Sequence, residues 1–333
     1  MAMSSSLPGV LPEGTPPVTD GDWQDQALIF DYRQAANPIR RGLTDPIPCQ
    51  QWSPPALEGL PSAILPLDLS DALGCPGPAT SPGLAAHYLR LCPGQPLQPA
   101  AVATSSLFYV QRGGGRMAFP GQDHPWARPM EWSQGDVIVL PHGLSPELVA
   151  HASSLLYWVH DGPLLRYLGV SPQGSRFTPC FYSAGSLQEA LDRLLADPSA
   201  ARSNRLSVLL AHAAFPASRT VTHTLWAMLG LVPPGASQAP HRHQSVAIDL
   251  IVDCAPGCYT LVGSELEESG HIRQPRRIEW ETGGVFITPP GYWHAHMNTS
   301  SKSARLLPIQ DAGLHTYLRS LDIRFSGGLA GHD

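Results

Sequence analysis

The chain has 333 residues, with 31 glycines, 35 prolines and a formal net charge of −6. This length suits one large β domain or two domains of about 150 residues, and either can bury a substantial core. The absence of any run of Lys and Arg argues against nucleic acid as a partner, because phosphate binding needs clustered cations. No apolar run reaches the roughly eighteen residues of a membrane span, and the polar start lacks a signal-peptide pattern. We therefore expect a cytoplasmic protein that acts on a small molecule.

Residues 1–60 are rich in Pro, Ser and Gly, which predicts an extended N-terminal arm lying on the globular part. Its first twenty residues contain too little apolar surface to offset the entropy of ordering. The apolar island Trp23–Tyr32 is expected to dock as a helix or a strand.

Short apolar runs broken by turns fill residues 61–182 and predict the strands of a sandwich or barrel. Gly113, Gly114 and Gly115 indicate a hairpin turn between two of these strands. The runs concerned are 86–94, 105–115, 130–143 and 153–170.

The pattern changes to that of a helix within residues 183–205, which we expect to link two β domains. Ser186 and Glu189 have capping-box spacing, and Asp197 precedes a proline that ends the helix. The predicted apolar face consists of Leu187, Leu191, Leu194 and Leu195. Strand patterns then return over residues 206–325.

Two histidine groups stand out in this second β segment. His241 and His243 are separated by one residue, so on a strand they face the same side. His294 and His296 follow a Pro-Pro-Gly turn. Three neutral imidazoles suit Fe, Zn, Cu or Ni and leave coordination positions open.

The two β segments repeat the same turn spacing. Gly235 precedes His241 by the same interval as Gly94 precedes Ala100. In the second motif, the turn glycines Gly283 and Gly291 correspond to Gly135 and Gly143. The first copy keeps these turn residues but has Ala100, Val102 and Pro146 where the second has His241, His243 and His294. We therefore expect segment 61–182 to be a degenerate copy without metal ligands.

The pattern Gly-x5-His-x-His with Gly-x5-Pro-x-Gly-x2-His-x3-Asn resembles the two signature motifs of the cupin superfamily. Two such units resemble a bicupin, which implies an all-β fold of two double-stranded β-helix (jelly-roll) domains with a linking helix. A Glu usually follows the cupin histidine pair as a fourth ligand, and here Ala247 and Ile248 occupy those positions.

Three histidines without that Glu resemble the gentisate, salicylate and 1-hydroxy-2-naphthoate 1,2-dioxygenase group, ring-cleaving Fe(II) enzymes that use O2. The resemblance implies that His241, His243 and His294 hold Fe(II). It also implies that His296 contacts substrate or oxygen, that the substrate is hydroxybenzoate-like, and that a homo-oligomer is possible.

Two positions depart from that group. Its working iron usually lies in the N-terminal cupin, whereas here only the C-terminal cupin carries ligands. Its arginine for the substrate carboxylate falls on Asp249, which has the strand parity of His241 and His243 and is a second candidate catalytic residue. Arg242, Arg276 and Arg277 are alternative partners for a carboxylate.

Other chemistries have little support. His142 and His151 lie near the degenerate second motif without a His-x-His partner, and the six cysteines are too sparse for a disulfide scaffold. Nucleotide-binding and nucleophile-elbow motifs are absent. The alternatives to a dioxygenase are a cupin lyase, isomerase or thiol oxygenase with a non-aromatic substrate, or a ligand-binding bicupin without turnover.

Overall fold

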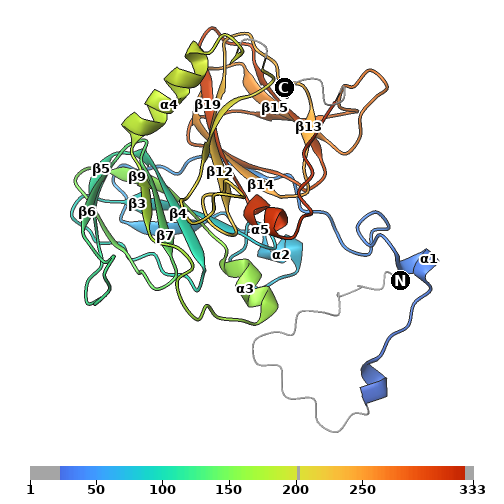
Figure 1. Cartoon of the computed structure of the whole chain (residues 1–333), viewed down its shortest axis with the longest axis horizontal. Coiled ribbons are helices and arrows are strands. Elements are labelled where there is room, and N and C mark those ends of the chain that lie inside the picture. Colours follow the sequence, from blue (N-terminus) through green and yellow to red (C-terminus); the bar gives the residue numbers. More distant parts are fainter. Residues whose placement is uncertain (1–22, 201–202, 327–333) are drawn as a thin grey trace.

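The structure, a computed structural model, describes residues 23–200 and 203–326 and consists mostly of antiparallel strands (Figure 1). The first half of the chain forms one β unit and the second half another, and the two lie side by side. The predicted all-β fold is confirmed, while the domain limits 61–182 and 206–325 stay a prediction.

The first half forms a six-stranded sheet and a smaller three-stranded sheet. The larger has the order β10-β7-β4-β9-β3-β2, and the smaller has the order β6-β5-β8. Their bounds are β2 (Ala63–Pro66), β3 (Ala85–Leu91), β4 (Ser105–Arg112), β5 (Gly114–Ala118), β6 (Met130–Ser133), β7 (Val137–Pro141), β8 (Glu147–Ala150), β9 (Ser154–His160) and β10 (Cys180–Tyr182).

The second half repeats this plan with a larger second sheet. Its six-stranded sheet has the order β1-β17-β14-β19-β12-β11, in which β1 comes from the N-terminal segment and pairs with β17. Its five-stranded sheet has the order β16-β15-β18-β13-β20. Their bounds are β1 (Gln51–Trp52), β11 (Leu206–Leu210), β12 (Trp226–Val232), β13 (His241–Arg242), β14 (Ala247–Asp253), β15 (Cys258–Gly263), β16 (Arg276–Glu279), β17 (Val285–Thr288), β18 (Trp293–Asn298), β19 (Ala304–Gln310) and β20 (Arg324–Phe325).

Helices are few and short. They are η1 (Trp23–Gln26), α1 (Tyr32–Ala35), α2 (Ser70–Leu73), α3 (Gly162–Leu168), α4 (Ala184–Ala196) and α5 (Ala312–Tyr317). The expected docking of the N-terminal island is wrong, because Leu28, Ile29 and Phe30 are exposed. The expectation for the first twenty residues lies outside the described residues.

The predicted linking helix is α4, but two of its details differ. Its N-cap is Ser183, whose side chain accepts a hydrogen bond from the backbone N–H of Ser186, so the cap lies three residues earlier than predicted. Leu187 and Leu191 are buried, whereas Leu195 is exposed. The helix ends at Ala196, and its C-cap Asp197 is extended, as expected for a residue before a proline.

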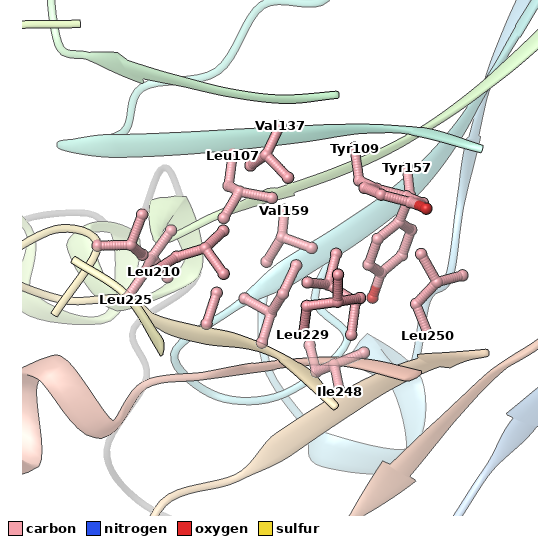
Figure 2. Close-up of a cluster of buried hydrophobic side chains, with 14 of the residues drawn as sticks. Leu107, Tyr109, Val137, Tyr157, Val159, Leu210, Leu225, Leu229, Ile248 and Leu250 are labelled. Carbon is pink, nitrogen blue, oxygen red and sulfur yellow. The ribbon is translucent and has the colours of Figure 1, made fainter. Parts of the chain in front are cut away.

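The two six-stranded sheets pack face to face through one shared core (Figure 2). Alternate residues of each strand point into this layer, including Leu107 and Val159 from the first half and Ile248 and Leu250 from the second. The other strand faces enclose a separate core in each half. The interior of each unit is thereby set off from the interface between the units.

The predicted turn glycines take the left-handed backbone conformation that favours glycine. The φ angles are 71° at Gly94 and 67° at Gly235, and they are 91° at Gly135 and 83° at Gly283. The predicted hairpin turn at the three consecutive glycines is wrong, because β4 and β5 do not pair with each other. Gly113 lies between them, where the chain passes from the six-stranded sheet to the three-stranded sheet. The repeat read from the sequence is therefore a repeat of backbone geometry.

Candidate metal centre

Strands β13 and β18 bring the two histidine motifs together. His241 is the direct antiparallel partner of His294, and their ring centroids lie 3.7 Å apart. His243 follows β13, and its carbonyl accepts a 2.7 Å hydrogen bond from the backbone N–H of Gly291 in the Pro-Pro-Gly turn. The turn glycine thus ties the second motif to the first.

Hydrogen bonds at Nδ1 orient the three rings. His241 Nδ1 lies 3.0 Å from the carbonyl oxygen of His294, and His294 Nδ1 lies 3.2 Å from that of Tyr292. His243 Nδ1 lies 2.9 Å from the carbonyl oxygen of Ser245. A carbonyl only accepts, so the Nδ1 atoms of His243 and His294 carry the proton and their Nε2 atoms keep the lone pair. At His241, the guanidinium of Arg205 contacts both ring nitrogens. A backbone carbonyl on the remote nitrogen is a frequent partner of a metal-binding histidine.

The three rings fit a transition-metal ion. One nitrogen from each of His241, His243 and His294 lies within 4.8 Å of the others, and all three residues are buried. Burial lowers the pKa of His243 to about 4 and the pKa values of His241 and His294 well below their ordinary value. His243 Nε2 is buried without a hydrogen-bond partner. Neutral, convergent nitrogens with an unsatisfied lone pair are what a metal ion requires.

His296 lies beside this group but outside it. Its ring centroid is 5.8 Å from that of His294 and 6.3 Å from that of His241. Its Nδ1 is 2.9 Å from Thr260 Oγ1, which also accepts a hydrogen bond from Trp280. The structure therefore places His296 as a neighbour of the three predicted ligands.

Asp249 points into the interior of the C-terminal unit. Its neighbours Ile248 and Leu250 belong to the shared core, so Asp249 takes the opposite face of β14. The side chain is buried and accepts a 2.8 Å hydrogen bond from Thr288 Oγ1. Burial raises the pKa of Asp249 to about 7. The carboxylate is outside the three-histidine group.

An arginine that the sequence did not single out enters the site. Arg205 precedes β11, and its Nη2 lies 2.7 Å from His241 Nδ1. Arg205 Nε is buried without a partner, and no carboxylate forms a salt bridge with this guanidinium in the described part of the chain. Burial lowers the pKa of Arg205 only to about 10, so the group is cationic at neutral pH.

Arg205, His241 and His243 line one cavity of about 340 Å³. Its polar lining is Arg205, His241, His243 and Gln310, and its apolar lining is Leu209, Trp226, Met228, Ile323 and Phe325. The cavity has the size and the mixture of apolar walls and few polar groups that small-molecule sites have.

The three arginines considered from the sequence lie outside the cavity that contains His241 and His243. Arg242 stacks on Trp293, and Arg277 stacks on Tyr259 and pairs with Glu279. Arg276 is exposed on β16. None of the three lines the histidine cavity.

The first half has no matching metal group among the described residues. Ala100 and Val102 are exposed, and Pro146 is buried. His151 is exposed and lies 3.0 Å from Glu131. The degenerate first copy stays a prediction.

Comparison with solved structures identifies the type of fold. Salicylate 1,2-dioxygenase from Pseudaminobacter salicylatoxidans matches with a TM-score of 0.69 over 92% of this chain and 95% of that chain, at 13% identity. The chain has a bicupin fold. A structure of that enzyme with gentisate matches over 95% of this chain and 98% of that chain, at 12% identity and a TM-score of 0.69. A variant of oxalate decarboxylase from Bacillus subtilis matches with a TM-score of 0.52, at 16% identity, over 84% of this bicupin and 81% of that chain.

Sequence comparison adds one distant relative. A stretch of 82 residues is 33% identical to gentisate 1,2 dioxygenase 1 of Aquipseudomonas alcaligenes. The match covers 25% of this chain and only 20% of that relative's length. No family model matches the bicupin. Among the described residues, no helix is long and apolar enough to cross a membrane.

Proposed function

We propose that this bicupin is a non-haem Fe(II) dioxygenase that cleaves the aromatic ring of a hydroxybenzoate-like substrate with O2. One observation carries the proposal: Arg205, which forms no salt bridge with the residues that the structure describes, lies against a buried group of three neutral histidines. The likeness to salicylate and gentisate dioxygenases supports the same reaction class.

His241, His243 and His294 would hold the ion, because one ring nitrogen from each lies within 4.8 Å of the others. Bound there, Fe(II) supplies open coordination positions for a hydroxy acid and O2 and a path for electrons from the ring. Three neutral ligands leave the charge of the ion uncompensated, which favours an anionic substrate.

Arg205 binds and orients the substrate carboxylate in this proposal. A guanidinium offers two parallel N–H groups that match the two oxygens of a carboxylate. The apolar side chains of Trp226 and Met228 line the same cavity and suit the ring. His296 would contact the substrate or oxygen. Asp249, whose pKa lies near neutrality, would hydrogen-bond to a hydroxyl group through its carboxyl oxygens.

The test is an oxygen-electrode screen of protein loaded with Fe(II) under nitrogen. Salicylate, gentisate and 1-hydroxy-2-naphthoate are offered in turn. We expect O2 uptake with at least one acid, matched by loss of its aromatic absorbance. The variant His241→Ala should show neither signal. If the loaded wild-type protein consumes no O2 with any member of the panel, the proposed function is wrong.

Asp249 favours a second candidate of another class. A buried carboxyl that holds a proton near neutral pH is a suitable general acid for a metal-dependent lyase or isomerase with a non-aromatic substrate. Turnover under nitrogen separates the two candidates, because a lyase or isomerase needs no O2. Tightly held Zn or Ni would also favour this second class.

A further inference from the structure

The C-terminal end of the described chain returns to the metal centre. Strand β20 pairs with β13, so that Phe325 lies opposite His241 and Arg324 opposite Arg242. The backbone N–H of Ser326 donates a 2.8 Å hydrogen bond to the carbonyl of Pro240. Strand β20 therefore covers the edge of the sheet that carries the histidines.

Within residues 23–200, the first half of the bicupin has no strand that corresponds to β20. Its small sheet consists of β6, β5 and β8, whereas the corresponding sheet of the second half also contains β13 and β20. Val102, which occupies the position of His243 in the first copy, is 58% exposed, while His243 is 3% exposed. The added strand thus accompanies the copy that kept its ligands.

Two side chains of this C-terminal segment reach the cavity. The ring of Phe325 stacks on His241, with centroids 5.7 Å apart and an interplanar angle of 22°. Ile323 and Phe325 line the same cavity as Arg205, and Trp226 and Met228 line it from the six-stranded sheet. An aromatic and a branched side chain here limit the width of the space beside His241.

We propose that Phe325 and Ile323 form the wall that sets which ring size the centre accepts. This inference rests on the proposed function for its substrate class. In this proposal, a single aromatic ring with its carboxylate at Arg205 occupies the cavity between the side chains that β20 and β12 contribute. A fused two-ring acid needs the space that Phe325 occupies. Phe325 is thus a specificity residue contributed by the end of the chain.

Binding of two acids to the full-length Fe(II)-loaded protein tests the proposal. Calorimetry under nitrogen compares salicylate with 1-hydroxy-2-naphthoate. Phe325→Ala should weaken salicylate binding about fivefold, the value of one aromatic contact, and strengthen naphthoate binding. The quantity compared is the ratio of the two dissociation constants, salicylate to 1-hydroxy-2-naphthoate. Phe325→Leu, which keeps apolar bulk, should change this ratio less than Phe325→Ala does. Leu318→Ala, at an exposed position outside the cavity, should leave it unchanged. An unchanged ratio in Phe325→Ala at equal metal content would overturn the proposal.

A second measurement needs neither metal nor substrate. Diethyl pyrocarbonate labelling of His241 in the metal-free protein, read by peptide mass spectrometry, reports how well β20 covers the ligand, which is 2% exposed. Phe325→Ala should raise labelling severalfold over the wild type and Leu318→Ala. If the wild type binds neither acid but Phe325→Ala is labelled more than the wild type, the proposed function is wrong and the position of Phe325 over His241 is supported. Unchanged labelling in Phe325→Ala refutes the wall even if the wild type binds both acids.

Discussion

Arg205 Nη2 lies 2.7 Å from the Nδ1 atom of His241, a residue 36 positions further along the chain. The two side chains come from different sheets, since Arg205 leads into β11 and His241 begins β13. Burial lowers the pKa of His241, and the positive charge of Arg205 lowers it further. One arginine thus favours the neutral form of His241 and also offers an anion a charge partner.

Replacing Arg205 by Gln should weaken binding of a carboxylate substrate. A hydrogen bond to a charged group is worth about 1.5–3 kcal/mol, so we expect KM to rise about 10- to 100-fold. The measurement compares each acid with its neutral carboxamide, for which Arg205→Gln should have little effect. Arg277→Gln is the matched control, because Arg277 is exposed and outside the cavity. Equal losses for acid and carboxamide would show that Arg205 does not bind the carboxylate.

Removing one ligand should remove the metal. His241→Ala and His243→Ala each leave two imidazoles, and we expect metal content measured by mass spectrometry to fall from near stoichiometric to a small fraction. His151→Ala, which alters an exposed histidine outside the group, should keep the wild-type content. Stoichiometric metal in His241→Ala would refute the three-histidine centre.

The sequence predicted the group of three histidines because turn glycines and histidines recur at fixed intervals. Gly235 and Gly283 need a positive φ, and the spacing from them leads to His241 and His294. Arg205 has no such signal. A single arginine before an edge strand is ordinarily a surface residue, and only the pairing of β11 with β12 brings it to the cavity.

Contacts that depend on tertiary structure also could not be predicted from the sequence. Nothing in the C-terminal segment predicts that Phe325 pairs with His241, because a two-residue strand has no periodicity. The exposure of Leu195 on α4 was missed for a related reason, since helical periodicity defines an apolar stripe but not how far the neighbouring sheet covers it.

The carboxyl of Asp249 should make the stability of the metal-free protein depend on pH. Burial raises its pKa from 3.8 to about 7. The folded state therefore keeps a proton that the unfolded state has released, and the free energy of unfolding falls as pH rises between these values. The full cost above pH 7 is on the order of 4 kcal/mol. Asp249→Asn should be more stable than the wild type at pH 8 and nearly equal to it at pH 4, as measured by urea denaturation.

Other groups titrate in both the wild type and Asp249→Asn, so their contributions to the free energy of unfolding cancel in this comparison. Burial also raises the pKa of Asp311 to about 7, so Asp249→Asn reduces the decline but does not abolish it. Burial lowers the pKa of His87 to about 4 and that of His160 to about 3. These two histidines destabilise the fold only as pH falls below their unfolded value. A stability difference that is constant from pH 4 to pH 8 would contradict the assignment to Asp249.

Two tyrosines in the shared core provide a test and a control for one hydrogen bond between the two halves of the chain. Tyr88 on β3 donates a 2.8 Å hydrogen bond to the carbonyl of Gly283, the turn glycine of the second metal motif. The hydroxyl of Tyr157 on the neighbouring strand is buried without a partner. Tyr88→Phe leaves that carbonyl without its side-chain donor and should lower the free energy of unfolding by about 1 kcal/mol. Tyr157→Phe removes an unsatisfied hydroxyl and should raise it by a similar amount. Urea denaturation measures both, and equal changes in the two variants would show that the bond from Tyr88 to Gly283 does not stabilise the fold.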